Sequence, residues 1–136
     1  MIKLPLHLFV YGTLLSGLEN HFYITGSKFI GKAKTIDKYS LYHLDYPKAT
    51  QKQNQIEIIG EVYLIEDIET LQRIDELEEH PTVYLRTSCK VILNESNEII
   101  NAQIYFNDNF DIKHKNCINI ANGDFREFLS TNSQNK

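Results

Sequence analysis

Cysteine pairs, long apolar runs and clustered positive charge are all scarce in this chain, and each shortage excludes a class of protein. The two cysteines, Cys89 and Cys117, lie far apart in the sequence, so we expect no disulfide framework and a reducing, cytoplasmic location. The apolar stretch from Leu4 to Leu15 is broken by polar residues and is shorter than the roughly 20 residues of a membrane span. It also has neither the cationic region nor the cleavage site of a signal peptide, so we expect no membrane partner.

Positive charge is sparse and scattered along the sequence. The 14 lysine and arginine residues against 18 aspartate and glutamate residues give a formal net charge of −4, with no basic run among aromatic residues. Nucleic acid is therefore not an expected partner. Neither a G-x-G-x-x-G nor a Walker pattern supports nucleotide binding. The five histidines show no metal-ligand spacing and have no cysteine pair beside them, so we expect no metal and no cofactor.

The remaining features fit one α+β domain. A length of 136 residues and a hydrophobic content of 42% are typical of a single globular domain. We expect that domain to span residues 1–129 and a polar C-terminal tail to follow over residues 130–136. Short strands together with two helices favour a strongly curved or barrel-like sheet. The expected strands are Leu4–Val10, Phe29–Thr35, Tyr39–Leu44, Ile56–Leu64, Tyr84–Leu93 and Ile99–Phe106.

Two helices complete the predicted elements. The stronger one spans Asp67–Glu79, with Asp67 as its N-cap and Pro81 just beyond its end. A second, short helix opens at Asp124, whose spacing to Glu127 matches a capping box. Irregular segments are expected at Lys48–Asn54, a polar loop, and at Asn94–Asn97, the turn of a hairpin.

Glu78 is the most informative residue of the stronger helix. At about 100° per residue it falls inside the apolar stripe of the helix, four residues after Ile74 and seven after Leu71. Desolvation and the negative end of the helix dipole both disfavour the charged carboxylate, which predicts a raised pKa. A carboxyl with a raised pKa can both accept and donate a proton near neutral pH, as a general acid/base does. The alternative is a last-turn glutamate whose side chain points into water.

The segment Tyr11-Gly12-Thr13-Leu14 follows the first strand and is a candidate binding turn. Gly12 removes a side chain where the chain turns, so another molecule can approach the backbone closely. Successive N–H groups in such a turn can hold a carboxylate or an oxyanion. The alternative is an ordinary turn at a strand end.

Several other side chains have two open interpretations. Arg86 shares a strand face with Tyr84 and either anchors a carboxylate or is solvated. Tyr63 and Tyr105 either line a cavity or pack in the core with satisfied hydroxyl groups. Cys89 lies on the apolar face of its strand and is expected to be a small core residue.

Five segments, taken in sequence order, carry a family resemblance: Phe9–Leu14, Tyr46–Pro47, Gly60–Tyr63, Leu71–Arg86 and Gly123–Arg126. Together they resemble the γ-glutamylcyclotransferase-like family, especially its γ-glutamylamine cyclotransferase branch. The most specific is Ile74–Pro81, followed by Tyr84 and Arg86. The resemblance covers nearly the whole chain and implies a small mixed β-barrel with flanking helices. Phe125 stands where many relatives have Trp, and Asp45 stands where relatives often have Gly, which leaves the choice of substrate open.

The resemblance implies that Glu78 is the catalytic acid/base and that the turn residues bind the glutamyl part of a small-molecule substrate. It implies a cofactor-free cyclotransferase lyase that converts a γ-glutamyl amine or γ-glutamyl amino acid to 5-oxoproline and a free amine. Two other functions fit the same resemblance: a catalytically silent small-molecule-binding module of the same fold, and a different acyl transfer in the same pocket. The sequence carries no signal for the leaving amine or for the oligomeric state. The turn residues are Tyr11, Gly12, Thr13 and Leu14.

Overall fold

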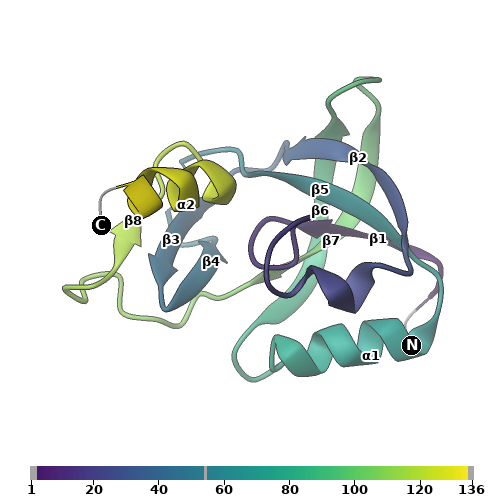
Figure 1. Cartoon of the computed structure of the whole chain (residues 1–136), viewed down its shortest axis with the longest axis horizontal. Coiled ribbons are helices and arrows are strands. Elements are labelled where there is room, and N and C mark those ends of the chain that lie inside the picture. The colour runs from purple at the N-terminus through teal and green to yellow at the C-terminus, as the bar shows by residue number, and fades with distance from the viewer. Residues whose placement is uncertain (1–2, 54, 135–136) are drawn as a thin grey trace.

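Five strands close into a barrel in the computed structural model, which describes residues 3–53 and 55–134 of the chain (Figure 1). In their order around the barrel, these strands are β1 (Leu6–Val10), β5 (Ile59–Ile65), β2 (Lys28–Thr35), β6 (Leu85–Leu93) and β7 (Ile99–Phe106). β1 pairs with β7 in parallel, with Leu8 opposite Gln103, and the other neighbouring pairs are antiparallel. The predicted α+β class and the small mixed β-barrel with flanking helices are therefore confirmed.

The barrel interior is filled because apolar side chains alternate along the strands. Successive side chains of a strand point to opposite faces. On β6, Cys89 and Val91 are buried, whereas their neighbours Ser88 and Lys90 are exposed. Cys89 is thus the core residue that the sequence predicted, and burial raises the pKa of its thiol to about 12.

Gly60 allows β1 and β5 to approach each other closely. A Cβ atom on Gly60 would lie 2.1 Å from the carbonyl oxygen of Val10 and 2.7 Å from the ring of Phe9. Both distances are shorter than any real Cβ contact, so no residue with a side chain fits there unless the backbone shifts. This contact fixes the end of β1, and the Tyr11 turn begins at the next residue.

A smaller sheet lies beside the barrel in the order β4 (Tyr46–Thr50), β3 (Ser40–Leu44), β8 (Ile118–Asn119). Asp45 makes the tight turn between β3 and β4 in the left-handed region, with φ of 66°. The helix α2 (Phe125–Gln134) packs on this sheet (Figure 1). The ring centroid of His43 on β3 lies 6.1 Å from that of Phe125 and 5.2 Å from that of Phe128.

The polar loop predicted from Lys48 onward is wrong for residues 48–50, which form the end of β4 and are buried. Their polar groups are satisfied inside the protein rather than by water. Lys48 Nζ donates to the carbonyl oxygen of Leu44 at 2.9 Å, and Thr50 Oγ1 donates to Asp108 Oδ1 at 2.6 Å. The polar composition of this segment therefore wrongly indicated a solvent-exposed loop at these three residues. Asn54, the last residue of the predicted loop, lies outside the described residues.

The helix α1 (Ile68–Leu77) begins as predicted and ends earlier than predicted. Asp67 is its N-cap and accepts a hydrogen bond from the backbone N–H of Thr70 at 2.9 Å. Glu78 is the C-cap, and Glu79 takes the left-handed conformation with φ of 53°. The N–H of His80 then donates to the carbonyl oxygen of Asp75 at 2.9 Å, which closes the helix end as in a Schellman motif.

Other boundaries also differ from the sequence prediction. β1 begins at Leu6 rather than Leu4, and β6 begins at Leu85 rather than Tyr84. β5 begins at Ile59 rather than Ile56, because Ile56 forms only a single bridge with Tyr39. The helix α2 continues through residues 130–134, which were expected to belong to a polar tail, while residues 135–136 lie outside the described part. The predicted cap of α2 is present in part: Asp124 Oδ1 accepts the N–H of Glu127 at 3.2 Å.

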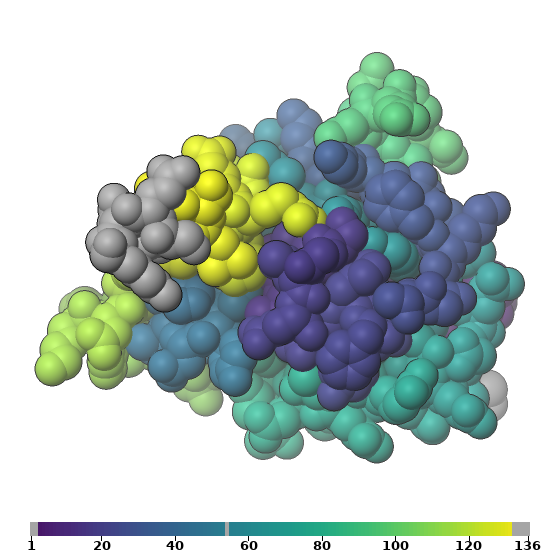
Figure 2. Space-filling model, viewed as in Figure 1, coloured from purple at the N-terminus to yellow at the C-terminus, as the bar shows by residue number. Residues whose placement is uncertain are grey.

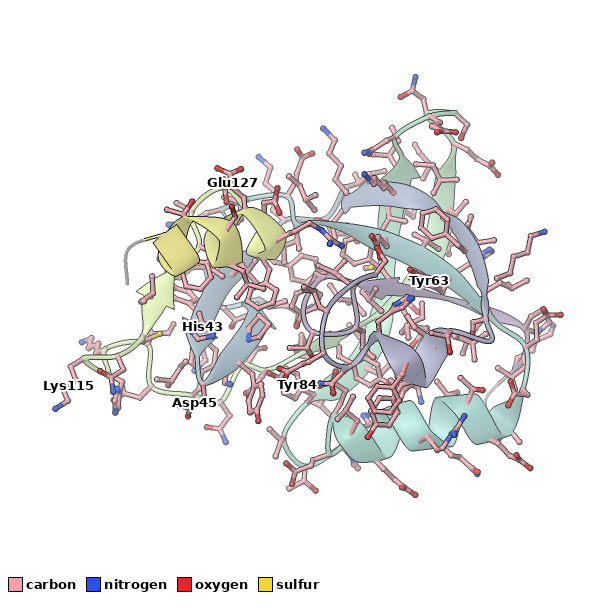
Figure 3. All side chains as sticks on the ribbon, in the orientation of Figure 1. His43, Asp45, Tyr63, Tyr84, Lys115 and Glu127 are labelled. Carbon is pink, nitrogen blue, oxygen red and sulfur yellow. The ribbon has the colours of Figure 1, made fainter. Side chains whose placement is uncertain are left out.

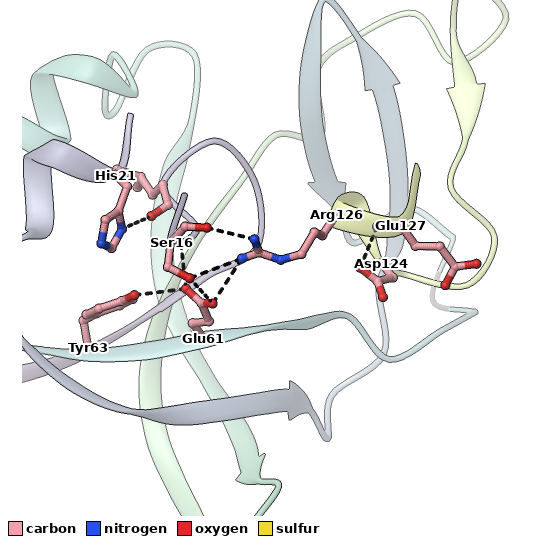
Figure 4. Close-up of polar contacts among 8 residues, drawn as sticks. Ser16, His21, Glu61, Tyr63, Asp124, Arg126 and Glu127 are labelled. Carbon is pink, nitrogen blue, oxygen red and sulfur yellow. Dashed lines mark hydrogen bonds and ion pairs between the residues drawn. The ribbon is translucent and has the colours of Figure 1, made fainter. Parts of the chain in front are cut away.

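The buried carboxylate of Glu61 ties the segment after β1 to the barrel and to α2 (Figure 4). It accepts hydrogen bonds from the N–H and the hydroxyl of Ser16, both at 2.9 Å, and from the Tyr63 hydroxyl at 3.0 Å. Arg126 adds an ion pair at 3.1 Å and also donates to the Ser16 carbonyl oxygen at 2.8 Å. Burial opposes ionisation of Glu61, but these donors outweigh it and hold the pKa of Glu61 below its ordinary value.

We predict that Glu61→Gln destabilises the folded protein by about 2 kcal/mol near neutral pH, the usual range for hydrogen bonds to a charged group. Because the pKa of Glu61 is lower in the folded state than its ordinary 4.5, this contribution is complete above about pH 4.5 and is lost as the pH falls through the folded-state pKa. Urea unfolding of both proteins at pH 7 and pH 3 measures the difference. The exposed pair of Lys34 and Glu57 supplies the control, since Glu57→Gln is expected to change stability little. An equal loss for Glu61→Gln at both pH values would contradict the prediction.

Candidate active site

A cavity of about 310 Å³ opens beside the turn that follows β1. Its volume is at the lower end of the roughly 300–1,000 Å³ that small-molecule sites occupy. Its walls come from this turn, from β4, from the C-terminal end of α1 and from the segment that leads into β6. In Figure 2 the N-terminal segment, in purple, occupies the middle of the displayed face between α2 in yellow and α1 in teal. The structure brings all five predicted site residues to this cavity: Tyr11, Gly12, Thr13, Leu14 and Glu78.

Glu78 enters the cavity from the end of α1. Its backbone N–H still donates to the carbonyl oxygen of Ile74 at 3.0 Å, so the helix fixes the position from which the side chain leaves. The side chain is partly buried, and its carboxyl forms no side-chain hydrogen bond with a described residue. Burial raises the pKa of Glu78 to about 7; the charge of Lys48 opposes this shift and that of Asp75 adds to it. Such a carboxyl can exchange a proton with a bound molecule near neutral pH.

The turn after β1 is held in place by the hydroxyl of Tyr11. This buried hydroxyl donates to the carbonyl oxygen of Tyr105 at 2.8 Å and accepts the N–H of Ala49 at 3.0 Å. A Cβ atom on Gly12 would lie 2.7 Å from the Pro47 ring, so the turn meets β4 only because this residue is glycine. The turn thus lies against both β7 and β4.

The backbone donors of this turn remain available. The carbonyl oxygens of Gly12 and Thr13 accept backbone hydrogen bonds from Leu15 and Asn20, each at 3.0 Å. By contrast, the N–H groups of residues 12–14 have no hydrogen-bond acceptor among the residues that the structure describes. Backbone donors without a partner beside a cavity are suited to a carboxylate or an oxyanion.

Arg86 is engaged by Asp75, which resolves the two interpretations left open by the sequence. Its guanidinium makes two hydrogen bonds to the Asp75 carboxylate, each of 3.1 Å, and the Tyr105 hydroxyl contacts the same carboxylate. The Arg86 side chain is 8% exposed and does not line the cavity, so it is neither solvated nor placed to touch a ligand there. This bidentate pair joins the last turn of α1 to β6. Because Glu78 follows Asp75 by only three residues, the pair also holds the end of the helix from which Glu78 projects.

The two tyrosines with open interpretations take different positions. Tyr105 lines the cavity, whereas Tyr63 donates its hydroxyl to Glu61, away from the cavity (Figure 4). Tyr84 also lines the cavity, and its hydroxyl donates to the carbonyl oxygen of Pro47 at 2.9 Å. Figure 3 shows Tyr84 on the side of α1 that faces the hairpin of β3 and β4, where Asp45 lies.

Lys48 is a cavity residue that the sequence analysis missed. It is 9% exposed, and its Nζ lies 5.7 Å from the centroid of the Tyr84 ring. Burial lowers the pKa of its amine, while the charges of Asp45 and Glu78 oppose that shift. The one available signal was its position directly after Tyr46–Pro47, a segment of the family resemblance. Its polar neighbours indicated a loop instead.

The described residues contain neither a cluster suited to a metal ion nor a helix suited to a membrane. Across residues 3–53 and 55–134, no group of three or more histidine, cysteine, aspartate or glutamate side chains is arranged to hold a metal ion. Within the same ranges, no helix is long and apolar enough to cross a membrane.

The sequence of this protein is similar to those of known proteins. A family model described as "Gamma-glutamyl cyclotransferase, AIG2-like" matches residues 8–127. A provisionally named gamma-glutamylcyclotransferase of Methanocaldococcus jannaschii is 39% identical over 124 residues, which covers 90% of this chain and 97% of that protein. Gamma-glutamylaminecyclotransferase A of Danio rerio is 32% identical over 123 residues, which covers 79% of this chain and 73% of that protein.

A solved structure agrees with these matches. The crystal structure of an uncharacterized protein from Pyrococcus horikoshii superimposes with a TM-score of 0.71 at 28% identity, over 95% of this chain and 97% of that one. The family model covers most of the chain, including every residue that the sequence analysis assigned to the site. The resemblance drawn from the sequence is therefore confirmed, and the chain belongs to the gamma-glutamyl cyclotransferase, AIG2-like family.

Proposed function

We propose that this protein is a cyclotransferase lyase that converts a γ-glutamyl amine or γ-glutamyl amino acid to 5-oxoproline and the free amine. The observation that carries the proposal is the Glu78 carboxyl, which lines a small cavity and whose pKa is raised to about 7. A carboxyl of that acidity is suited to take up and release one proton in each catalytic cycle. Membership of the family supports the reaction class.

In the proposed reaction the substrate supplies its own nucleophile. The α-amine of the glutamyl group attacks the γ-carbonyl carbon, a new C–N bond closes the five-membered lactam, and the bond to the leaving nitrogen breaks. The α-ammonium first gives one proton to the Glu78 carboxylate, which frees the amine for the attack, and Glu78 delivers that proton to the leaving nitrogen. The second proton, which the attacking nitrogen loses as the lactam forms, passes to the same leaving nitrogen, which departs as an ammonium. Such general acid/base catalysis contributes about 10²–10⁴-fold, and folding the substrate so that its two ends meet contributes a further proximity effect.

The turn after β1 supplies the second part of the proposed site. The N–H groups of Gly12, Thr13 and Leu14 have no described acceptor and would hold the substrate carboxylate or the oxyanion that forms on the γ-carbonyl. Tyr11 has a different role, because its hydroxyl is already bonded to backbone groups on β4 and β7 and keeps the turn in place. The small cavity volume supports a substrate of dipeptide size.

We predict that Glu78→Gln lowers kcat by at least about 10²-fold without unfolding the protein, because the amide cannot exchange the proton. Release of 5-oxoproline from a panel of γ-glutamyl amines and γ-glutamyl dipeptides measures this, and circular dichroism checks the fold. Glu76→Gln is the matched control, since Glu76 lies on the exposed face of α1 outside the cavity and should keep full activity.

Each alternative result has a defined meaning. Full turnover by Glu78→Gln would remove Glu78 from the mechanism. If the folded wild-type protein binds members of the panel without releasing 5-oxoproline, the protein is a binding module of the same fold rather than an enzyme.

The proposed role of Glu78 also predicts how activity depends on pH. The free enzyme must carry Glu78 as the carboxylate, so kcat/KM should fall as the pH drops through about 7, the raised pKa of this group. A second decline at higher pH is expected where the substrate loses its ammonium proton. A pH profile of kcat/KM between pH 5 and 9 measures both limbs. A flat profile between pH 5 and 7 would contradict Glu78 as the titrating base.

A further inference from the structure

Lys48 is a buried cation without a carboxylate partner in the cavity wall. Among the described residues that line the cavity, it is the only lysine, arginine or histidine. Its Nζ donates to the carbonyl oxygens of Leu44 at 2.9 Å and Tyr46 at 3.5 Å, and it forms no ion pair with a described residue. The charges of Asp45 and Glu78 act on Lys48 without forming an ion pair, so they compensate its buried charge only in part. An anionic group bound beside Lys48 would therefore be favoured.

The surroundings of Lys48 hold its ammonium group in one place. Nζ lies 5.9 Å from the ring centroid of Tyr46, 5.7 Å from that of Tyr84 and 6.0 Å from that of Phe110. Aromatic rings at such distances attract the cation and restrict its stem. An ammonium has three N–H donors, and the two carbonyl oxygens use two of them. The third donor can serve a ligand, and a charge-assisted bond to a carboxylate is the strongest it could form.

The position of Lys48 assigns it to one part of the substrate. Tyr11 at the turn is 6% exposed, whereas Tyr46 and Val83, which also line the cavity, are 57% and 38% exposed and mark its mouth. The proposed function puts the glutamyl part against the turn, so the leaving amine extends toward the mouth. Lys48 stands on β4 two residues after Tyr46, at the wall that the leaving amine passes.

We propose that Lys48 is a specificity-determining residue that binds a carboxylate on the leaving amine. This inference rests on the proposed function and sharpens it: the preferred substrates are γ-glutamyl compounds whose leaving group is an amino acid with its carboxylate close to the amide that breaks. A neutral alkylamine in the same place would leave Lys48 unpaired, and a leaving group with an additional cation there would be repelled.

The test compares γ-glutamylglycine with γ-glutamylglycinamide, which differ only in the carboxylate of the leaving group. We expect wild-type kcat/KM to favour γ-glutamylglycine by about 10- to 100-fold, the range for one charge-assisted hydrogen bond. Lys48→Met keeps the unbranched stem without the charge and should bring the ratio close to one, while Lys48→Arg should retain most of the preference. Both compounds are measured on each variant because the charge of Lys48 also lowers the pKa of Glu78. The ratio cancels that effect and any partial loss of folded protein.

Two results would overturn the inference. One is a wild-type ratio of one or less. The other is a Lys48→Met variant that loses activity on both compounds by the same factor, because Lys48 would then serve the glutamyl part or the fold instead.

Binding measurements separate this inference from the proposed function. If the wild type releases 5-oxoproline from neither compound, the proposed reaction fails, and calorimetric affinities for the two compounds then decide about Lys48. Tighter binding of γ-glutamylglycine that disappears in Lys48→Met would sustain the assignment of Lys48. Equal affinities, or no binding of either compound, would overturn it.

Discussion

The hydroxyl of Tyr11 joins the two sheets of the molecule at the point where the cavity lies. It donates to the carbonyl oxygen of Tyr105 on β7 and accepts the N–H of Ala49 on β4, both inside the protein. Because burial of these groups without partners would be costly, the two bonds hold the barrel and the smaller sheet in one arrangement. The turn from Gly12 to Leu14 follows directly and lies against β4 through the contact of Gly12 with Pro47. The cavity walls formed by the turn and by β4 therefore meet at this junction.

Three carboxylates of this protein show how the groups around a carboxyl decide its chemistry. Glu61 has four donors around it and is held ionised at the end of the turn segment. Asp75 is paired in bidentate fashion with Arg86 and fixes α1 to β6. Glu78 has no such donors, and burial raises its pKa to about 7. The same functional group thus stabilises the fold in two places and is available for proton transfer in the third.

The C-terminal end of α1 determines where the Glu78 carboxyl lies. Had the helix continued to Glu79 as its sequence suggested, Glu78 would lie in the last helical turn. The Schellman-type closure through His80 and the left-handed Glu79 end the helix at Leu77 instead. Glu78 therefore sits at the cap, where its N–H is still bonded to Ile74 and its side chain lies against the cavity. A rigid element thereby positions the group without burying it in the core.

Local patterns in the sequence were enough for much of this protein, because they depend on neighbouring residues only. The apolar periodicity and the Asp67 cap predicted α1, the alternation around Cys89 predicted β6, and the ordered motifs indicated the family, its mixed barrel and the five residues that line the cavity. The position of Glu78 in the apolar stripe of the helix also predicted its raised pKa. Tertiary structure alone decided the burial of Lys48 and the pairing of Arg86 with Asp75. Each of these depends on groups far away in sequence: the Lys48 ammonium is surrounded by rings from three segments, and Arg86 reaches a helix eleven residues earlier. Desolvation and charge pairing arise between such distant groups only once the chain has folded, so no local pattern could encode them.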